Sequence, residues 1–198
     1  MSLLNLADIR FGTLAEGPGR RIAVWAQGCP RACPSCCNPE MQSLTPAAVV
    51  ETAEILADFA DALEEHPEIE GLTLVGGEPV LQAASMAELA AWMQERGRSV
   101  LLFTGFSYAE LEQAARQDLG IQKLLKHTDL LVDGPFLSSS QDRKRPWIGS
   151  TNQQVYHLTD FYPAGIEYED KPRSMEIHLA DGYAYLNGWP FDKMQAQD

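Results

Sequence analysis

The sequence of 198 residues lacks the features that mark membrane and secreted proteins. It has no run of about 18 apolar residues, so we expect no membrane-spanning helix. Its N-terminus has neither the basic start nor the apolar core of a signal peptide. We therefore expect a cytoplasmic protein that is not attached to a membrane.

Basic residues and paired histidines are also scarce. Fifteen Lys and Arg stand against 28 Asp and Glu, which gives a formal net charge of −13. Such a chain repels phosphates, so we predict no general nucleic-acid binding. The short basic run Arg143-Lys144-Arg145 is interpreted as a solvated loop, with docking of an acidic partner as the alternative. Structural or surface roles are predicted for the scattered histidines, which are His66, His127, His157 and His178.

No cysteine lies outside residues 29–37, and this crowding argues against an ordinary disulfide framework. Within the loop 28–38, Cys29, Cys33 and Cys36 have the spacing C-x3-C-x2-C. Three thiolates can hold three irons of a four-iron cluster, whereas the usual cluster has four cysteine ligands. The pattern therefore predicts a [4Fe-4S] cluster with one iron left open for a substrate or cofactor. Cys37 is interpreted as a neighbour of this cluster and not as a ligand.

A zinc site is the alternative for the same loop. Zinc prefers four nitrogen or sulfur ligands in a tetrahedron, often as two separated pairs. Cys37 directly follows Cys36 and is an awkward fourth ligand, and the chain has no second cysteine pair. The spacing favours the iron–sulfur cluster.

Apolar segments of strand length alternate with helical segments along the chain. Predicted strands cover Ile22–Ala26, Leu72–Val75, Ser99–Phe103 and Asp129–Val132. Predicted helices begin at Thr45-Pro46 and at two capping boxes, Ser85-x-x-Glu88 and Ser107-x-x-Glu110, with Gly97 ending the second helix. This order predicts an α/β fold, a partial (β/α) barrel of parallel strands, in which ligands bind at the strand ends.

The C-terminal part of the sequence follows a different pattern. Gln154–Leu158 is predicted to form a strand, and Met175–Leu179 and Tyr183–Asn187 flank Asp181-Gly182 as a β-hairpin. We expect a small β appendage over about residues 150–190 within a single domain of residues 1–198. Packing in the core or against the hairpin is predicted for Trp147, Trp189 and Phe191.

A second motif, Gly76-Gly77-Glu78-Pro79, ends the strand Leu72–Val75. Two glycines allow the backbone to approach a ligand closely, and the Glu78 carboxylate can accept hydrogen bonds from a ligand ammonium group. Taken alone, the motif is equally compatible with an ordinary turn between a strand and a helix.

The two motifs together resemble the radical S-adenosylmethionine (SAM) superfamily, in which the open iron binds SAM and a Gly-Gly-Glu motif contacts its methionyl amine. Further segments resemble the activating enzymes of anaerobic ribonucleotide reductase, over about residues 16–190. These segments are Glu16–Arg20, Phe103–Tyr108, Leu131–Phe136 and Gly149–Gln153. The resemblance implies that Thr104 and Asp133 line the SAM pocket and that Asn152 and Gln153 close over the nucleoside. Local capping or turn roles remain the alternative for these residues.

The sequence also differs from this family around the cysteine loop. Ser35 before the third cysteine fits the small residue of the reductase activases, but Cys37 replaces the aromatic residue that usually follows. Met41-Gln42-Ser43 stands in place of their common Thr-Trp. These differences leave the SAM chemistry in place and concern the partner.

The resemblance implies reductive cleavage of SAM to methionine and a 5′-deoxyadenosyl radical, after reduction of the cluster by flavodoxin or ferredoxin. The radical then abstracts hydrogen from a glycine of a partner glycyl radical enzyme, such as anaerobic ribonucleotide reductase. Two alternatives remain: a stand-alone radical SAM enzyme that modifies a peptide or small metabolite, and a non-catalytic iron–sulfur or zinc protein.

Overall fold

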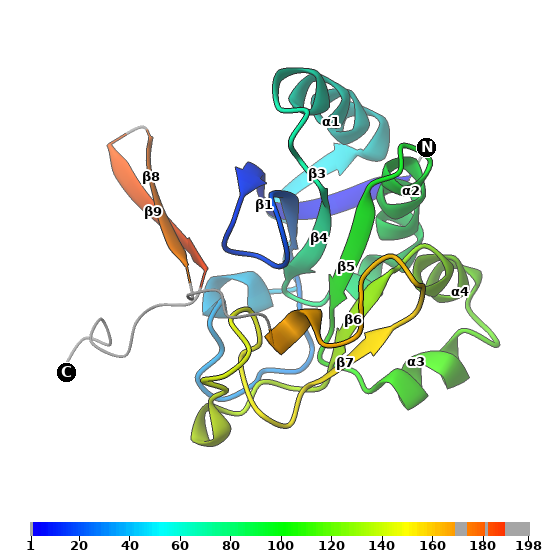
Figure 1. Cartoon of the computed structure of the whole chain (residues 1–198), viewed down its shortest axis with the longest axis vertical. Helices are drawn as coiled ribbons and strands as arrows, with labels where there is room; N and C mark the ends of the chain where they lie inside the picture. The colour runs from blue at the N-terminus through cyan, green and yellow to red at the C-terminus, as the bar shows by residue number, and fades with distance from the viewer. Residues whose placement is uncertain (1, 169–173, 181, 189–198) are drawn as a thin grey trace.

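The computed structural model describes residues 2–168, 174–180 and 182–188. Its centre is a seven-stranded sheet in the order β3-β1-β2-β4-β5-β6-β7 (Figure 1). The strands are β1 Leu3–Thr13, β2 Arg21–Ala26, β3 Ala48–Glu51, β4 Gly71–Gly76, β5 Ser99–Phe103, β6 Leu130–Asp133 and β7 Gln154–His157. The central strands β2, β4, β5 and β6 are parallel, while β1, β3 and β7 pair antiparallel with their neighbours. The parallel centre brings four C-terminal strand ends to one edge of the sheet.

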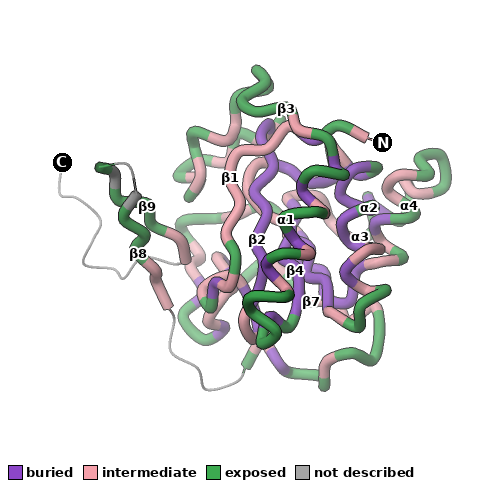
Figure 2. Tube along the Cα trace, turned by 90° about the horizontal axis from the view of Figure 1, so that it is seen from above, coloured by how far each residue is buried: buried purple, intermediate pink, exposed green. Residues whose placement is uncertain are grey.

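Apolar residues cover both faces of this sheet. The larger cluster joins the strands to the helices and includes Phe59, Met86 and Leu102. The smaller cluster includes Leu101 and Ile148. Leu101 and Leu102 belong to different clusters because successive strand residues point to opposite faces. Figure 2 accordingly shows buried residues concentrated along β2 and β4.

Four α-helices accompany the strands. They are α1 Thr52–Glu65, α2 Ala83–Gln94, α3 Tyr108–Ala114 and α4 Leu119–Lys126. Short 3-10 turns lie at η1 Pro39–Gln42, η2 Pro79–Gln82, η3 Ser138–Ser140 and η4 Ile166–Tyr168. Within the described ranges, no helix has both the length and the apolar character needed to cross a membrane.

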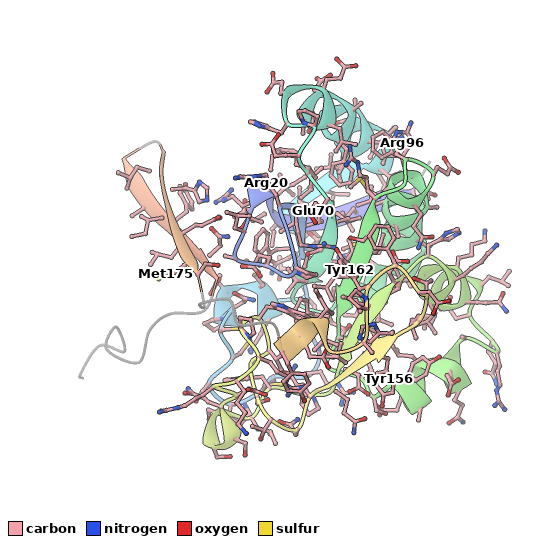
Figure 3. The ribbon with its side chains drawn as sticks, viewed as in Figure 1. Arg20, Glu70, Arg96, Tyr156, Tyr162 and Met175 are labelled. Carbon is pink, nitrogen blue, oxygen red and sulfur yellow. The ribbon has the colours of Figure 1, made fainter. Side chains whose placement is uncertain are left out.

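A buried arginine ties the strands together at their N-terminal ends. The Arg21 guanidinium donates to the Thr73 hydroxyl and the Leu72 carbonyl, each at 2.6 Å, and to Ser99 and Tyr162 at 3.1 Å. Burial lowers the pKa of Arg21, but its donors are satisfied by neutral oxygens from neighbouring strands and from Tyr162, which is labelled in Figure 3. The end of the sheet opposite the strand C-termini is thereby fixed.

The structure confirms the four predicted central strands, within one residue at their ends. The capping box of Ser107 and Glu110 at the start of α3 is also as predicted. Gly97, predicted to end the second helix, follows the end of α2 at Gln94 and has a positive φ. The strands β1 and β3 and the helix α4 are additional elements that the sequence pattern did not indicate.

Two predicted helix starts are wrong. Thr45-Pro46 begins no helix, because residues 48–51 pair with β1 as strand β3 and the helix starts at Thr52. Ser85 lies inside α2, where its hydroxyl donates to the Leu3 carbonyl at 2.7 Å. Glu88, its expected capping partner, instead accepts from the Thr52 hydroxyl at 2.6 Å. In both cases contacts with distant parts of the chain replace the local motif.

The predicted C-terminal hairpin is present as β8 Met175–Ala180 and β9 Tyr183–Gly188, which form a separate two-stranded sheet. Figure 1 shows it standing off the rest of the molecule. The strand β7 pairs with β6 and so belongs to the central sheet and not to the appendage. Trp189 and Phe191, for which packing was predicted, lie outside the described residues, as does Asp181.

Candidate cofactor site

A cavity of about 1250 Å³ lies at the C-terminal ends of the parallel strands. Cys29, Cys33 and Cys36 line it together with Gly76, Gly77, Glu78 and Thr104. These residues come from the segments that follow β2, β4 and β5. The two sequence motifs therefore share one cavity.

The cysteine loop is attached to its surroundings mainly by backbone hydrogen bonds. The Gly28 and Cys29 amides donate to the Met41 and Gln42 carbonyls at 2.8 and 3.1 Å, and the Glu78 amide donates to the Gly28 carbonyl at 2.8 Å. Within the loop, Ala32 and Ser35 have positive φ angles of 44° and 60°. Such angles are uncommon for residues other than glycine, and they mark a tight, specifically shaped loop.

The thiols of this loop differ in their readiness to lose a proton. Burial raises the pKa of Cys29, whereas a hydrogen bond from the Cys37 thiol lowers the pKa of Cys36. The Asn38 amide also donates to the Cys36 sulfur at 3.4 Å. The same contact with Cys36 raises the pKa of Cys37. Because the thiolate is the form that binds metal, this contact favours Cys36 over Cys37 as a candidate ligand.

The three cysteines fit a cluster better than a single ion. Among the described residues, no three His, Cys, Asp or Glu side chains are grouped closely enough to hold one metal ion. In an iron–sulfur cluster the cysteine thiolates bind different irons, so the sulfurs need not converge on one point. Three thiols facing one cavity are a suitable donor set for such a cluster.

The two glycines of the second motif permit a close approach between backbones. Gly76 has φ +104°, and a Cβ atom on Gly77 would lie 2.5 Å from the Gly28 carbonyl oxygen and 2.8 Å from that of Met41. The expected close approach is therefore to the cysteine loop itself. Glycine at position 77 allows β4 and the cysteine loop to lie side by side.

Glu78 is 1% exposed and forms several hydrogen bonds within the protein. One carboxylate oxygen accepts from the Thr104 hydroxyl at 2.8 Å and the Val80 amide at 3.1 Å, and the other accepts from the Gly105 amide at 2.8 Å. Burial nevertheless raises the pKa of Glu78. Glu78 thus joins the ends of β4 and β5 at the wall of the cavity.

Of the other residues that the resemblance implied, Gln153 lines the cavity, whereas Asp133 and Asn152 lie outside its lining. Asp133 accepts from the Tyr108 amide at 2.7 Å and the Gln154 amide at 3.2 Å. The exposed Asn152 donates to the Pro135 carbonyl at 2.8 Å. Gly134, the neighbour of Asp133, lines the cavity instead. The structure thus gives Asp133 and Asn152 the local contacts that the sequence analysis kept as an alternative.

Arg31, between the first two cysteines, lies against the segment that follows β5. Its guanidinium carbon lies 4.2 Å from the centre of the Phe106 ring, and its Nη2 lies 3.3 Å from Glu110. Arg31 also lines the cavity, and its buried Nε has no hydrogen-bond partner. The sequence analysis did not single it out, because its partners are some 75 positions away in the chain.

Several other lining residues escaped the sequence analysis as site residues. Glu16 and Arg10 come from the N-terminal part of the chain, and Met175, His178 and Tyr185 come from the hairpin. Trp147, for which core packing was predicted, lines the cavity and packs edge-on against Phe103. These residues share no sequence motif, and only the fold brings them to the same cavity.

The basic run is divided between buried and exposed positions. Arg145 is buried, and its Nε lies 2.6 Å from the Asp142 carboxylate. Arg143 and Lys144 are exposed. The interpretation of the run as a solvated loop therefore holds for its first two residues only.

Comparison with known proteins agrees with this site. A family model described as "4Fe-4S single cluster domain" matches residues 15–156. The anaerobic ribonucleoside-triphosphate reductase-activating protein of Vibrio cholerae is 31% identical over 74% of this chain and 93% of its own. The proteins of that name from Pasteurella multocida and Escherichia coli K12 are 29% and 28% identical, over 75% and 73% of this chain and 94% and 93% of their own. The chain belongs to the family of anaerobic ribonucleoside-triphosphate reductase-activating proteins, enzymes with a 4Fe-4S cluster domain.

Proposed function

We propose that this chain is a radical SAM activating enzyme for a glycyl radical enzyme such as anaerobic ribonucleotide reductase. Cys29, Cys33 and Cys36 hold the [4Fe-4S] cluster, and SAM occupies the adjoining part of the cavity. In this proposal the central sheet is the partial barrel of that superfamily and residues 1–198 form one cytoplasmic domain. Flavodoxin or ferredoxin supplies the electron.

One observation carries the proposal. The three cysteines and the segment 76–78 line the same cavity, although some 40 residues separate them in the sequence. When bound, the reduced cluster would supply one electron to the sulfonium of SAM, and SAM would supply, with release of methionine, the 5′-deoxyadenosyl radical that takes one hydrogen atom from the partner's glycine. The chain's own contribution is placement and shielding.

The residues around the cysteines have distinct tasks in this proposal. The backbone bonds of Gly28 and Cys29 keep the loop at the strand ends. Glu78, held by Thr104 and Gly105, fixes the wall on which the methionyl part of SAM rests. The Cys36 thiol gives up its proton readily because Cys37 donates to it. Phe103 and Trp147 provide apolar surface that excludes water from the cavity.

The test compares two neighbouring cysteines. Cys33→Ala and Cys37→Ala are reconstituted anaerobically with iron and sulfide, and bound iron, visible absorbance and dithionite-dependent formation of 5′-deoxyadenosine are measured. Cys33→Ala is expected to abolish 5′-deoxyadenosine formation and to change the bound iron, while Cys37→Ala retains both. Full cleavage by Cys33→Ala, or zinc in place of iron in protein purified without air, would contradict the proposal.

The identity of the hydrogen donor requires a separate measurement. Anaerobic ribonucleotide reductase is added to the reduced, SAM-loaded protein, and electron paramagnetic resonance detects a glycyl radical on the reductase. Formation of that radical supports the proposed partner. Cleavage of SAM without a glycyl radical would favour the stand-alone enzyme that modifies a peptide or small metabolite.

A further inference from the structure

The two faces of the C-terminal hairpin differ in character. Ile177 pairs directly with Leu186, and Leu179 pairs with Ala184. Residues opposite one another on antiparallel strands share a face, and successive residues alternate between faces. One face therefore carries Ile177, Leu179, Ala184 and Leu186, which we call the apolar hairpin face. It bears no charged residue.

The opposite face attaches the hairpin to the body of the protein. Glu176 accepts from the Leu14 amide at 2.8 Å, and Asn187 donates to the Thr13 hydroxyl at 2.9 Å. The Arg10 guanidinium lies 5.2 Å from the centre of the Tyr185 ring. These contacts come from β1 and the residues just after it. The apolar hairpin face is left free of them.

The apolar hairpin face is largely exposed. Ile177 is 57% exposed, Leu179 is 81% exposed and Leu186 is 54% exposed. A two-stranded hairpin is at best marginally stable by itself in water, and clustered exposed apolar residues mark interaction surfaces more often than scattered ones do. The face thus has the composition of a surface that another molecule covers.

The position of the hairpin beside the cavity suggests which molecule covers the apolar hairpin face. Leu179, Ala184 and Leu186 also line the cavity that holds the three cysteines. In a chain of net charge −13, this uncharged surface at the cavity admits an apolar partner surface without an electrostatic penalty. A protein that places a glycine in this cavity comes close to these hairpin residues, because they form part of its lining.

We propose that the apolar hairpin face is the docking surface for the protein substrate, and that it packs against an apolar surface of that protein. The inference rests on the proposed function, since it assigns part of the partner contact to a residue set of this chain. It predicts that binding of the partner depends on Ile177, which lies on this face outside the cavity lining, while SAM cleavage alone does not.

Ile177 is the residue to change, because it lies on this face but does not line the cavity. Ile177→Thr keeps a β-branched side chain, whereas Ile177→Asp adds a charge. Leu119→Asp is the matched control, since Leu119 is 70% exposed at the start of α4 and is not part of the cavity lining. Affinity for anaerobic ribonucleotide reductase is measured anaerobically by biolayer interferometry on the reconstituted proteins. Cleavage of SAM without partner is measured in parallel.

Ile177→Asp is expected to weaken partner binding by roughly tenfold or more, as for a central interface residue. Ile177→Thr should have a smaller effect, while Leu119→Asp and the cleavage of SAM without partner stay unchanged. Equal affinity of Ile177→Asp and the parent protein would overturn the inference. The inference would also be overturned if Ile177→Asp, in the absence of the reductase, sedimented as a smaller species than the parent protein. In that case a second copy of this chain would cover the face. A parent protein that binds the reductase through Ile177 but cleaves no SAM would refute the proposed function and leave the docking surface standing.

Discussion

Arg31 illustrates how single side chains hold the candidate site together. It extends from the cysteine loop to the ring of Phe106 and to Glu110, which also accepts from the Ser107 amide at 2.7 Å. One side chain therefore connects the cysteine loop to the N-terminus of α3. An arginine can do this because its planar cation stacks on a ring and pairs with a carboxylate at the same time.

Arg31→Gln is expected to destabilise the folded protein by about 1 kcal/mol, because it removes a cation–π contact and a partly exposed ion pair. It should also slow the anaerobic uptake of iron by the loop. Denaturant unfolding and the time course of the visible absorbance measure the two effects. Arg116→Gln, at an exposed position after α3, serves as the control. Equal uptake rates for both variants would show that Arg31 does not support the loop.

Residue types and spacing indicated the three cysteines and the Gly-Gly-Glu segment as candidate site residues, and both line one cavity. They did not indicate the contacts of individual side chains. Glu78 was expected to offer its carboxylate to a ligand, yet it accepts three hydrogen bonds from Val80, Thr104 and Gly105. Those partners follow from the juxtaposition of β4 and β5. No local pattern around Glu78 indicates them.

At the level of secondary-structure elements, the close approach of β4 to the cysteine loop depends on Gly77. Gly77→Ala would place a Cβ atom against two backbone carbonyls, and neither can move without displacing its strand or loop. We expect a loss of stability of about 1–3 kcal/mol and poor cluster incorporation. Thermal unfolding and iron content measure these effects.

Gly97→Ala provides the comparison for this prediction. Gly97 has φ +68°, and a Cβ atom there would meet nothing within 4 Å. Its cost is therefore conformational only, about 1 kcal/mol, and the cluster should load normally. Cluster loading that falls equally in both variants would argue against a specific role for the contact between Gly77 and the loop.

The elements with strong local signals were predictable, and those that depend on distant pairing were not. Continuous apolar runs such as Val100–Phe103 indicate buried parallel strands by themselves. Residues 48–51 form a strand because they pair with β1, and that pairing delays the helix to Thr52. The half-buried β1 lacks a continuous apolar run, so its presence depends on β2 and β3.

For the molecule as a whole, the hairpin and the body meet at a buried carboxyl group. Glu16 accepts from the Gly188 amide at 2.8 Å, and burial raises its pKa from 4.5 to about 7. The folded protein therefore binds this proton more tightly than the unfolded chain does. The stability that this bound proton contributes to the folded state is fully present below pH 4.5, falls as the pH rises towards 7 and is absent above that.

Glu16→Gln keeps the acceptor for Gly188 but cannot ionise. We expect the variant to be more stable than the parent protein by about 1–3 kcal/mol at pH 8 and equally stable at pH 4.5. Denaturant unfolding at the two pH values gives the difference. For the control Glu64→Gln, at an exposed position on α1, the difference in stability from the parent protein is expected to be the same at both pH values. A Glu16→Gln difference that does not vary with pH would exclude this titration.

The backbone bonds of the cysteine loop have a consequence for how such proteins diverge. Gly28 and Cys29 are fixed through amides and carbonyls, which every residue type except proline supplies. Apart from Arg31, substitution between the cysteines therefore leaves the frame of the loop in place, provided that positions 32 and 35 tolerate a positive φ. Proteins that share under a third of their residues can therefore keep the same backbone conformation of the cysteine loop while the side chains around it are substituted.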